Sequence, residues 1–196
     1  MAPQIPSTQD FQFIAGSLAL DFVNTVGNRL GSARDYFSSP RDALRWARLA
    51  RVQTLARDSR MSRSDLAECR GRRENLYALF IPCCSGLSPN GRALAHLNRD
   101  VAILCRKRAL RRVAGGYRWI VSGSTAERLA YLIETDAADL LNSGRFRLIR
   151  QCQDRSCGWL FLDRSKRQNR RWCSMRDCGN RAKARRHYAH TRHSAP

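Results

Sequence analysis

The sequence of 196 residues lacks any hydrophobic run of about 18 residues, the length that a membrane-crossing helix requires. This absence excludes a conventional transmembrane helix, and we expect no membrane partner. The first residues also lack a basic segment followed by a long apolar stretch, so we expect no secretory signal. A reducing cell interior follows from that, and we predict a cytoplasmic, nucleoid-associated protein.

Acidic residues are scarce: 16 Asp and Glu stand against 36 Lys and Arg, a net charge of +20. Such a surplus predicts a polyanionic partner, most often a nucleic acid. The surplus is also uneven, because residues 145–196 hold 15 basic and three acidic side chains, whereas residues 1–144 hold 21 and 13. We therefore expect the nucleic-acid contact in the C-terminal part of the chain.

Motifs of enzymes are missing as well. The sequence contains no nucleophile elbow, phosphate-binding loop or HExxH motif. The four histidines do not form a site either, because His96 stands alone and the others lie in the basic tail. We predict that the protein is not an enzyme.

The hydrophobic fraction of 43% is enough to form a core, and helix signals dominate the first three quarters of the chain. Helix starts are predicted at Ser39-Pro40, at Ser62 or Ser64, at Ser88-Pro89 and at the capping box of Ser124 and Glu127. Two short β-forming runs flank Gly115-Gly116 and predict a hairpin. The expected fold is mainly α (α+β): a multi-helical domain with a short β-hairpin over residues 1–147, then a small module of knuckle, short strands and helix over residues 148–196.

The eight cysteines fall into two groups. Four have irregular spacing in apolar, helical surroundings, and buried free thiols explain them best: Cys69, Cys83, Cys84 and Cys105. The other four form two close pairs, each with four intervening residues: Cys152 with Cys157, and Cys173 with Cys178. Two such knuckles can supply four thiolates in tetrahedral geometry, so we predict a structural Zn²⁺ site.

Alternatives to four-cysteine zinc ligation remain open at this point. Two disulfides or four free thiols would use the same cysteines, although disulfides fit poorly with a reducing interior. His187 or His190 could replace one cysteine as a ligand.

The segments around the last two cysteines carry most of the candidate nucleic-acid contacts. After Cys178 the sequence has helical character and almost no apolar face, as expected of a helix on a charged partner. The candidates in this loop and helix are Lys166, Arg167, Arg170, Arg171, Arg176, Asn180, Arg181, Lys183, Arg185 and Arg186. Arginines can bind phosphates or guanine edges and Asn180 can pair with adenine, so DNA is the predicted partner. RNA, or polyanions bound without specificity, is the alternative that the charge does not distinguish.

The C-terminal segment resembles a known family. The run from Cys152 to Tyr188 resembles the CGNR zinc finger, which is named for the tetrapeptide that stands here as Cys178-Gly179-Asn180-Arg181. The segment FQFIAGSLALDFVNTVGNR near the N-terminus resembles the start of the ABATE domain, a stress-induced transcription regulator domain. The resemblance implies zinc bound by Cys152, Cys157, Cys173 and Cys178, DNA binding, and regulation of transcription.

The same resemblance implies that the N-terminal domain senses a ligand. The polar residues of its D-F-x-N-T core, Asp21, Asn24 and Thr25, are candidates for binding a small-molecule effector. The alternative is that these side chains cap helices or bind buried backbone groups. The N-terminal domain is also the candidate region for homodimer formation.

Overall fold

The computed structural model describes residues 11–52 and 59–193, the last four of these by backbone only. The helices in these ranges are α1 Leu18–Val23, α2 Pro40–Leu49, α3 Arg63–Phe80, α4 Gly91–Arg106, α5 Thr125–Asn142 and α6 Asn180–His193. The strands are β1 Val26–Gly27, β2 Arg34–Asp35, β3 Arg108–Val113, β4 Gly116–Val121, β5 Ile149–Gln151 and β6 Leu160–Leu162. They pair in order as three antiparallel two-stranded units, so the predicted mainly α fold with small strand pairs is confirmed.

Serine caps begin three of the helices, as the sequence predicts. Ser39, Ser62 and Ser124 each form a capping box with an acidic residue three positions later. The predicted start of the next helix at Ser88-Pro89 is wrong by two residues. Asn90 caps α4 instead, because its side-chain oxygen accepts a hydrogen bond from the Ala93 amide at 2.9 Å.

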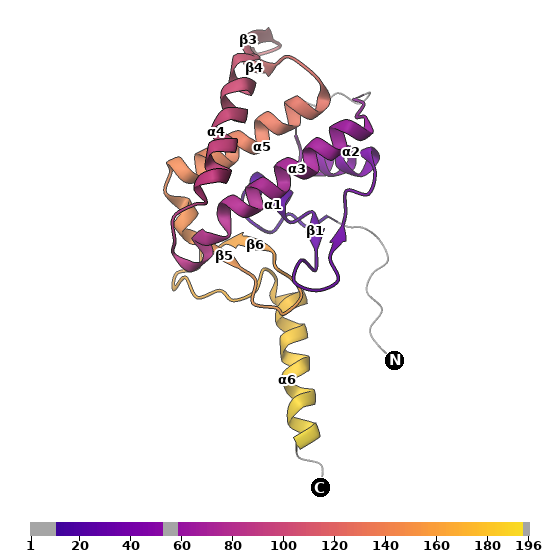
Figure 1. Ribbon diagram of the computed structural model, residues 1–196, viewed down its shortest axis with the longest axis vertical. Helices are drawn as coiled ribbons and strands as arrows, with labels where there is room; N and C mark the ends of the chain where they lie inside the picture. The colour runs from indigo at the N-terminus through magenta and orange to yellow at the C-terminus, as the bar shows by residue number, and fades with distance from the viewer. Residues whose placement is uncertain (1–10, 53–58, 194–196) are drawn as a thin grey trace.

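The helices α1 to α5 form the body of the molecule (Figure 1), with α5 packed against α1, α3 and α4. Its core includes a cluster of aromatic rings, in which Phe22 and Phe37 both contact Trp46. All three rings are almost fully buried. This cluster fixes α1, and therefore the segment that follows α1, against the body.

The strand pair β5–β6 packs against that segment. Asn24 lies at the end of α1, and its amide donates to the Leu160 carbonyl at 2.8 Å while its oxygen accepts from the Leu160 amide at 2.9 Å. The Trp159 indole donates to the Val26 carbonyl at 2.8 Å. Residues on both sides of position 147 thus share one buried cluster. The division into domains at residues 147 and 148 stays a prediction.

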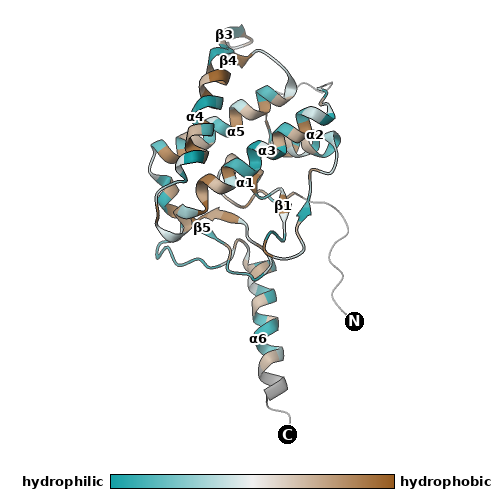
Figure 2. Cartoon of the chain, in the orientation of Figure 1, coloured by the Kyte–Doolittle hydropathy of each residue, from teal (hydrophilic) through white to brown (hydrophobic). Residues whose placement is uncertain are grey.

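Two elements extend from the body at opposite ends of its long axis (Figure 1). The hairpin β3–β4 lies at one end, with Leu110 opposite Trp119 and Arg111 opposite Arg118. Helix α6 projects from the other end, and hydrophilic residues alternate along it with more apolar ones (Figure 2).

Across the described residues, no helix combines the length and the apolar character that crossing a membrane requires. This finding agrees with the absence of a long apolar run in the sequence.

Candidate metal centre and nucleic-acid interface

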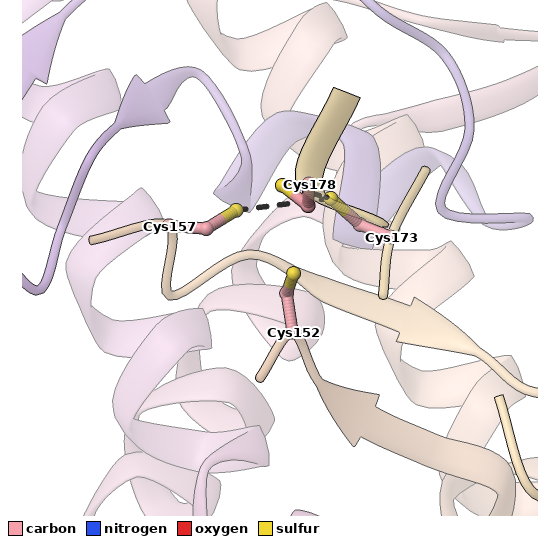
Figure 3. A group of neighbouring side chains, drawn as sticks. All are labelled: Cys152, Cys157, Cys173 and Cys178. Atoms are coloured by element: carbon pink, nitrogen blue, oxygen red, sulfur yellow. Dashed lines mark hydrogen bonds between the residues drawn. The ribbon is translucent and has the colours of Figure 1, made fainter. Parts of the chain in front are cut away.

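Two turns bring the four cysteines of the C-terminal region together (Figure 3). Cys152 directly follows β5, and its amide donates to the Trp159 carbonyl at 2.8 Å, which closes the first turn over Cys157. Cys178 lies in a π-helical turn, Met175–Gly179, which Ser174 begins by accepting from the Asp177 amide at 3.2 Å. Backbone and side-chain hydrogen bonds therefore hold both knuckles in shape.

The distances between the four sulfur atoms fit a tetrahedral metal site. All lie within 4.8 Å of one another, and Cys173 Sγ is 3.7 Å from Cys157 Sγ and 3.5 Å from Cys178 Sγ. Zinc–thiolate bonds of about 2.3 Å require sulfur separations of about 3.8 Å. The cysteines are all buried and no disulfide joins them. They form a candidate metal site, and their assignment as zinc ligands stays a prediction.

The other four cysteines are scattered through the body. Cys69 and Cys83 are buried, whereas Cys84 and Cys105 are partly buried. Burial raises the pKa values of the Cys69 and Cys84 thiols to about 12, which keeps both protonated at neutral pH. In the candidate metal site, by contrast, hydrogen bonding among the sulfurs lowers the pKa of Cys152 and raises those of Cys157 and Cys173.

A buried carboxylate joins the first knuckle to α6. The side chain of Asp154 is fully buried, and its Oδ2 accepts hydrogen bonds from Arg185 at 2.8 Å and from Arg181 at 3.4 Å. Arg181 also donates to Cys178 Sγ at 3.1 Å. Burial raises the pKa of Asp154, but the hydrogen bonds from Arg185 and Ser156 lower it below its ordinary value overall. The first turns of α6 are therefore fixed to the cysteine cluster.

Two further arginines among the candidate nucleic-acid contacts bind groups of the protein. Arg170 donates to the carbonyls of Trp172 and Cys173, and its guanidinium lies 4.4 Å from the centre of the Phe161 ring. Arg171 donates to Gln153 Oε1 at 2.7 Å, although most of its side chain is exposed. Arg170 thus stabilises the loop between the two cysteine pairs.

The remaining candidates face outward. They are exposed, and no hydrogen bond or ion pair ties their side chains to the described residues: Lys166, Arg167, Arg176, Asn180, Lys183 and Arg186. A groove of about 320 Å³ runs between α6 and the segments beside Cys152 and Cys173. It is lined by Gln153, Arg155, Arg171, Trp172, Ala182, Arg185, Arg186 and Ala189. Four arginines around one groove make it strongly attractive to anions.

The candidate effector-binding residues of the N-terminal region are buried and hydrogen-bonded within the protein. Asp21 accepts from the Ala15 amide at 2.9 Å, and burial raises its pKa to about 6. Thr25 donates to the Phe22 carbonyl at 2.7 Å and accepts from Arg73 at 3.2 Å. With Asn24 bound to Leu160, these contacts agree with the alternative in which the residues bind backbone groups. An effector site at these positions stays a prediction.

The residues that join the first knuckle to the body were not among the candidates that the sequence indicated. The amides of Arg29 and Leu30 donate to the Cys157 and Ser156 carbonyls at 3.0 and 3.1 Å. Gly158 has φ +71°, and an added Cβ would lie 2.9 Å from Arg29 Cβ. Only a glycine lets the two segments approach this closely. Its place directly after Cys157 was the available signal.

His187 is exposed, and the side chain of His190 lies outside the described residues. The four cysteines alone form the cluster of metal-binding residues found in the described part of the chain. Neither histidine is therefore needed to complete the site.

Comparison with protein families finds two matches. Residues 148–191 match the CGNR zinc finger, and residues 16–144 match the ABATE family, described as "Putative stress-induced transcription regulator". Both are in the order that the sequence resemblance predicts. None of the curated proteins matches the chain.

Proposed function

The chain belongs to the ABATE family and carries a CGNR zinc finger, and from this premise we propose that it is a zinc-dependent, DNA-binding regulator of transcription. The proposal places the DNA contact on α6 and on the groove at its base. Its location would be the cytoplasm, in association with the nucleoid.

The observation that carries the proposal is the attachment of a projecting, exposed helix to a four-cysteine cluster. Asn180, the first residue of α6, follows the last cysteine by two positions, and Asp154 holds Arg181 and Arg185 on the side facing the knuckle. Lys183 and Arg186 are exposed on the same helix. A helix held in this way can enter a major groove while the arginines of the basal groove bind phosphates.

The shape of the element favours duplex DNA over duplex RNA. The major groove of B-DNA admits an α-helix, whereas that of A-form RNA is too deep and narrow for side chains to read. Helix α6 spans 14 residues, which corresponds to about 21 Å. This length is enough to lie across a major groove about 12 Å wide.

Zinc is the ion that the donor set fits best. Four sulfur donors select a soft or borderline ion, and Zn²⁺ accepts their tetrahedral arrangement without a geometric preference of its own. When bound, it cross-links the two knuckles. The Arg181 hydrogen bond to Cys178 stabilises the thiolate form of that ligand. With four protein ligands the site leaves no open position for a substrate, which supports a structural and non-enzymatic role.

The test is a selection from random duplex DNA at near-physiological salt, followed by affinity measurements on the enriched sequence. We expect a motif with the zinc-loaded chain. Exchange of both exposed cations, Lys183→Gln with Arg186→Gln, should weaken binding to that motif about tenfold or more. It should also reduce the number of counterions released on binding by about two, as measured from the slope of log binding constant against log salt concentration.

The matched control removes the same charge elsewhere. Arg41 on α2 and Arg63 on α3 are both exposed, so Arg41→Gln with Arg63→Gln should leave the selected motif and its affinity nearly unchanged. Equal effects of the two double variants, or stronger binding to duplex RNA than to duplex DNA, would contradict the proposal.

A further inference from the structure

The hairpin β3–β4 exposes both of its faces. On one face Arg111 lies directly opposite Arg118. On the other, Leu110 lies opposite Trp119 and is 54% exposed, while Tyr117 is 70% exposed. A two-stranded hairpin with so little burial is marginally stable by itself.

The charge of the hairpin is of one sign only. Residues 101–126 contain no Asp or Glu, whereas the strands carry Arg108, Arg111, Arg112 and Arg118. Lys107, at its base, is paired with Glu127 on α5. Like charges directly opposite each other on one face destabilise a strand pair, and an external polyanion would remove that repulsion.

The two faces are not equivalent. Arg108 lies over the Trp119 ring, 4.1 Å from its centre, and donates to the Tyr131 hydroxyl on α5 at 3.0 Å. The aromatic face is thus partly in contact with the body. Arg111 and Arg118 are exposed, and neither has a hydrogen-bond or ion-pair partner among the described residues. Arg118 also lines a hollow of about 550 Å³ beside Asp136 and Asp139 of α5, so Arg111 is the more freely accessible of the two.

We propose that the hairpin is a second DNA-binding element, which binds a duplex through the exposed Arg111 and Arg118. A two-stranded ribbon fits the major groove of B-DNA, and strands of six residues are about 20 Å long. The hairpin and α6 lie at opposite ends of the long axis (Figure 1), so the two elements face different stretches of duplex. The inference rests on the proposed DNA binding by α6 but uses a separate surface.

Opposed arginines also argue against a second copy of this chain on the same face. Two hairpins stacked through Arg111 and Arg118 would bring four guanidinium groups together, and the strands themselves carry no carboxylate. A duplex supplies phosphates at the spacing of its backbone instead.

The decisive measurement is the number of short duplexes bound per chain. With a duplex of about 12 base pairs, about 40 Å long, the zinc-loaded chain should bind two duplexes at low salt. The variant Arg111→Gln with Arg118→Gln should bind one, and Lys183→Gln with Arg186→Gln should also bind one. The control Arg41→Gln with Arg63→Gln should still bind two.

Each other outcome has a defined meaning. One duplex per wild-type chain, or unchanged binding in the Arg111 and Arg118 variant, overturns the hairpin proposal and leaves the proposed function of α6 intact. Loss of all binding from the hairpin variant alone overturns the role of α6 instead. A change in self-association without a change in DNA binding identifies the face as a homodimer contact and refutes the proposal.

A second measurement does not depend on removing charge. A photoreactive amino acid in place of Ala114, at the exposed tip of the hairpin, should cross-link to DNA, whereas the same residue in place of the exposed Ala95 on α4 should not. Equal cross-linking at both positions would refute a specific contact. Zinc content of the hairpin variant should equal that of the wild type, and its thermal midpoint should not fall, because Arg111 and Arg118 are exposed and their mutual repulsion is removed.

Discussion

The two cysteine turns, with the side chains that hold them to the body, form the base from which helix α6 projects. This base and α6 both carry charged side chains, but those of the base bind other groups of the protein whereas most of those on α6 face solvent. At the base, charged and polar side chains bind other groups of the protein: Asp154 holds two arginines, Arg170 binds two carbonyls, and Asn24 binds Leu160. Along α6, Lys183 and Arg186 are exposed to solvent. The positive charge near the cysteines is therefore not one surface. Part of it stabilises the knuckles, and the rest is available to a partner.

The largest loss of stability should come from replacing one of the four cysteines of the base. Cys173→Ser should reduce bound zinc from one equivalent to nearly none. The free energy of unfolding should fall by more than about 3 kcal/mol, since zinc binding contributes about 10 kcal/mol or more in small fingers. Metal analysis by mass spectrometry with denaturant unfolding measures both.

The matched control for this variant is Cys105→Ser, which changes a partly buried thiol on α4 outside the cluster. It should retain zinc and nearly all of its stability. Full zinc content in the Cys173 variant would show that the four-cysteine assignment is incorrect.

A smaller loss of stability should follow when a contact between the base and the body is removed and all four cysteines are kept. Asn24→Ala removes two buried hydrogen bonds and leaves the Leu160 amide and carbonyl without them. The free energy of unfolding should fall by about 2–4 kcal/mol while one zinc remains bound. Urea unfolding followed by fluorescence, with zinc content measured in parallel, tests this. Unchanged stability would instead favour Asn24 as an effector-binding residue.

The smallest change in stability should come from Asp21, a buried carboxyl group on α1. Burial raises the pKa of Asp21 from 3.8 to about 6, so the folded chain binds more protons than the unfolded chain between these values. Protonated Asp21 is therefore favoured by folding, and the free energy of unfolding falls as pH rises from about 4 to about 6 and Asp21 loses its proton. Asp21→Asn keeps an acceptor for the Ala15 amide and removes the titration, so its stability relative to wild type should grow by about 1–3 kcal/mol from pH 4 to pH 6.

Urea unfolding of both chains at several pH values measures this difference, and any acid-induced loss of metal affects both chains alike. A difference that stays constant with pH would show that Asp21 titrates near its ordinary value in the folded chain.

Local signals predicted much of this structure. Serine followed three residues later by an acid marked three helix starts, and glycines between β-forming runs marked the hairpin, because both patterns act within a few residues. The four cysteines were identified for the same reason: two short spacings specify two knuckles.

Contacts between distant segments left no such signal. Nothing in the spacing of the chain indicates that Asp154 holds Arg185, or that Asn24 binds Leu160 across 136 positions. From the sequence, all arginines near the cysteines are therefore equivalent candidates for nucleic-acid contact. Only the fold separates Arg170, Arg181 and Arg185, which bind groups of the protein, from Lys183 and Arg186.

The contact between Asn24 and Leu160 also constrains the order in which the chain folds during its synthesis. Asn24 leaves the ribosome long before Leu160 does, because 136 positions separate them. Until Leu160 has been synthesised, the segment that follows α1 lacks its partner strand β6. The part of the hydrophobic core that β5 and β6 cover is then exposed to solvent. Contacts of such long sequence separation form slowly. The helical body is thus completed only when the cysteine region has been synthesised, which ties the arrival of the metal to the last stage of folding.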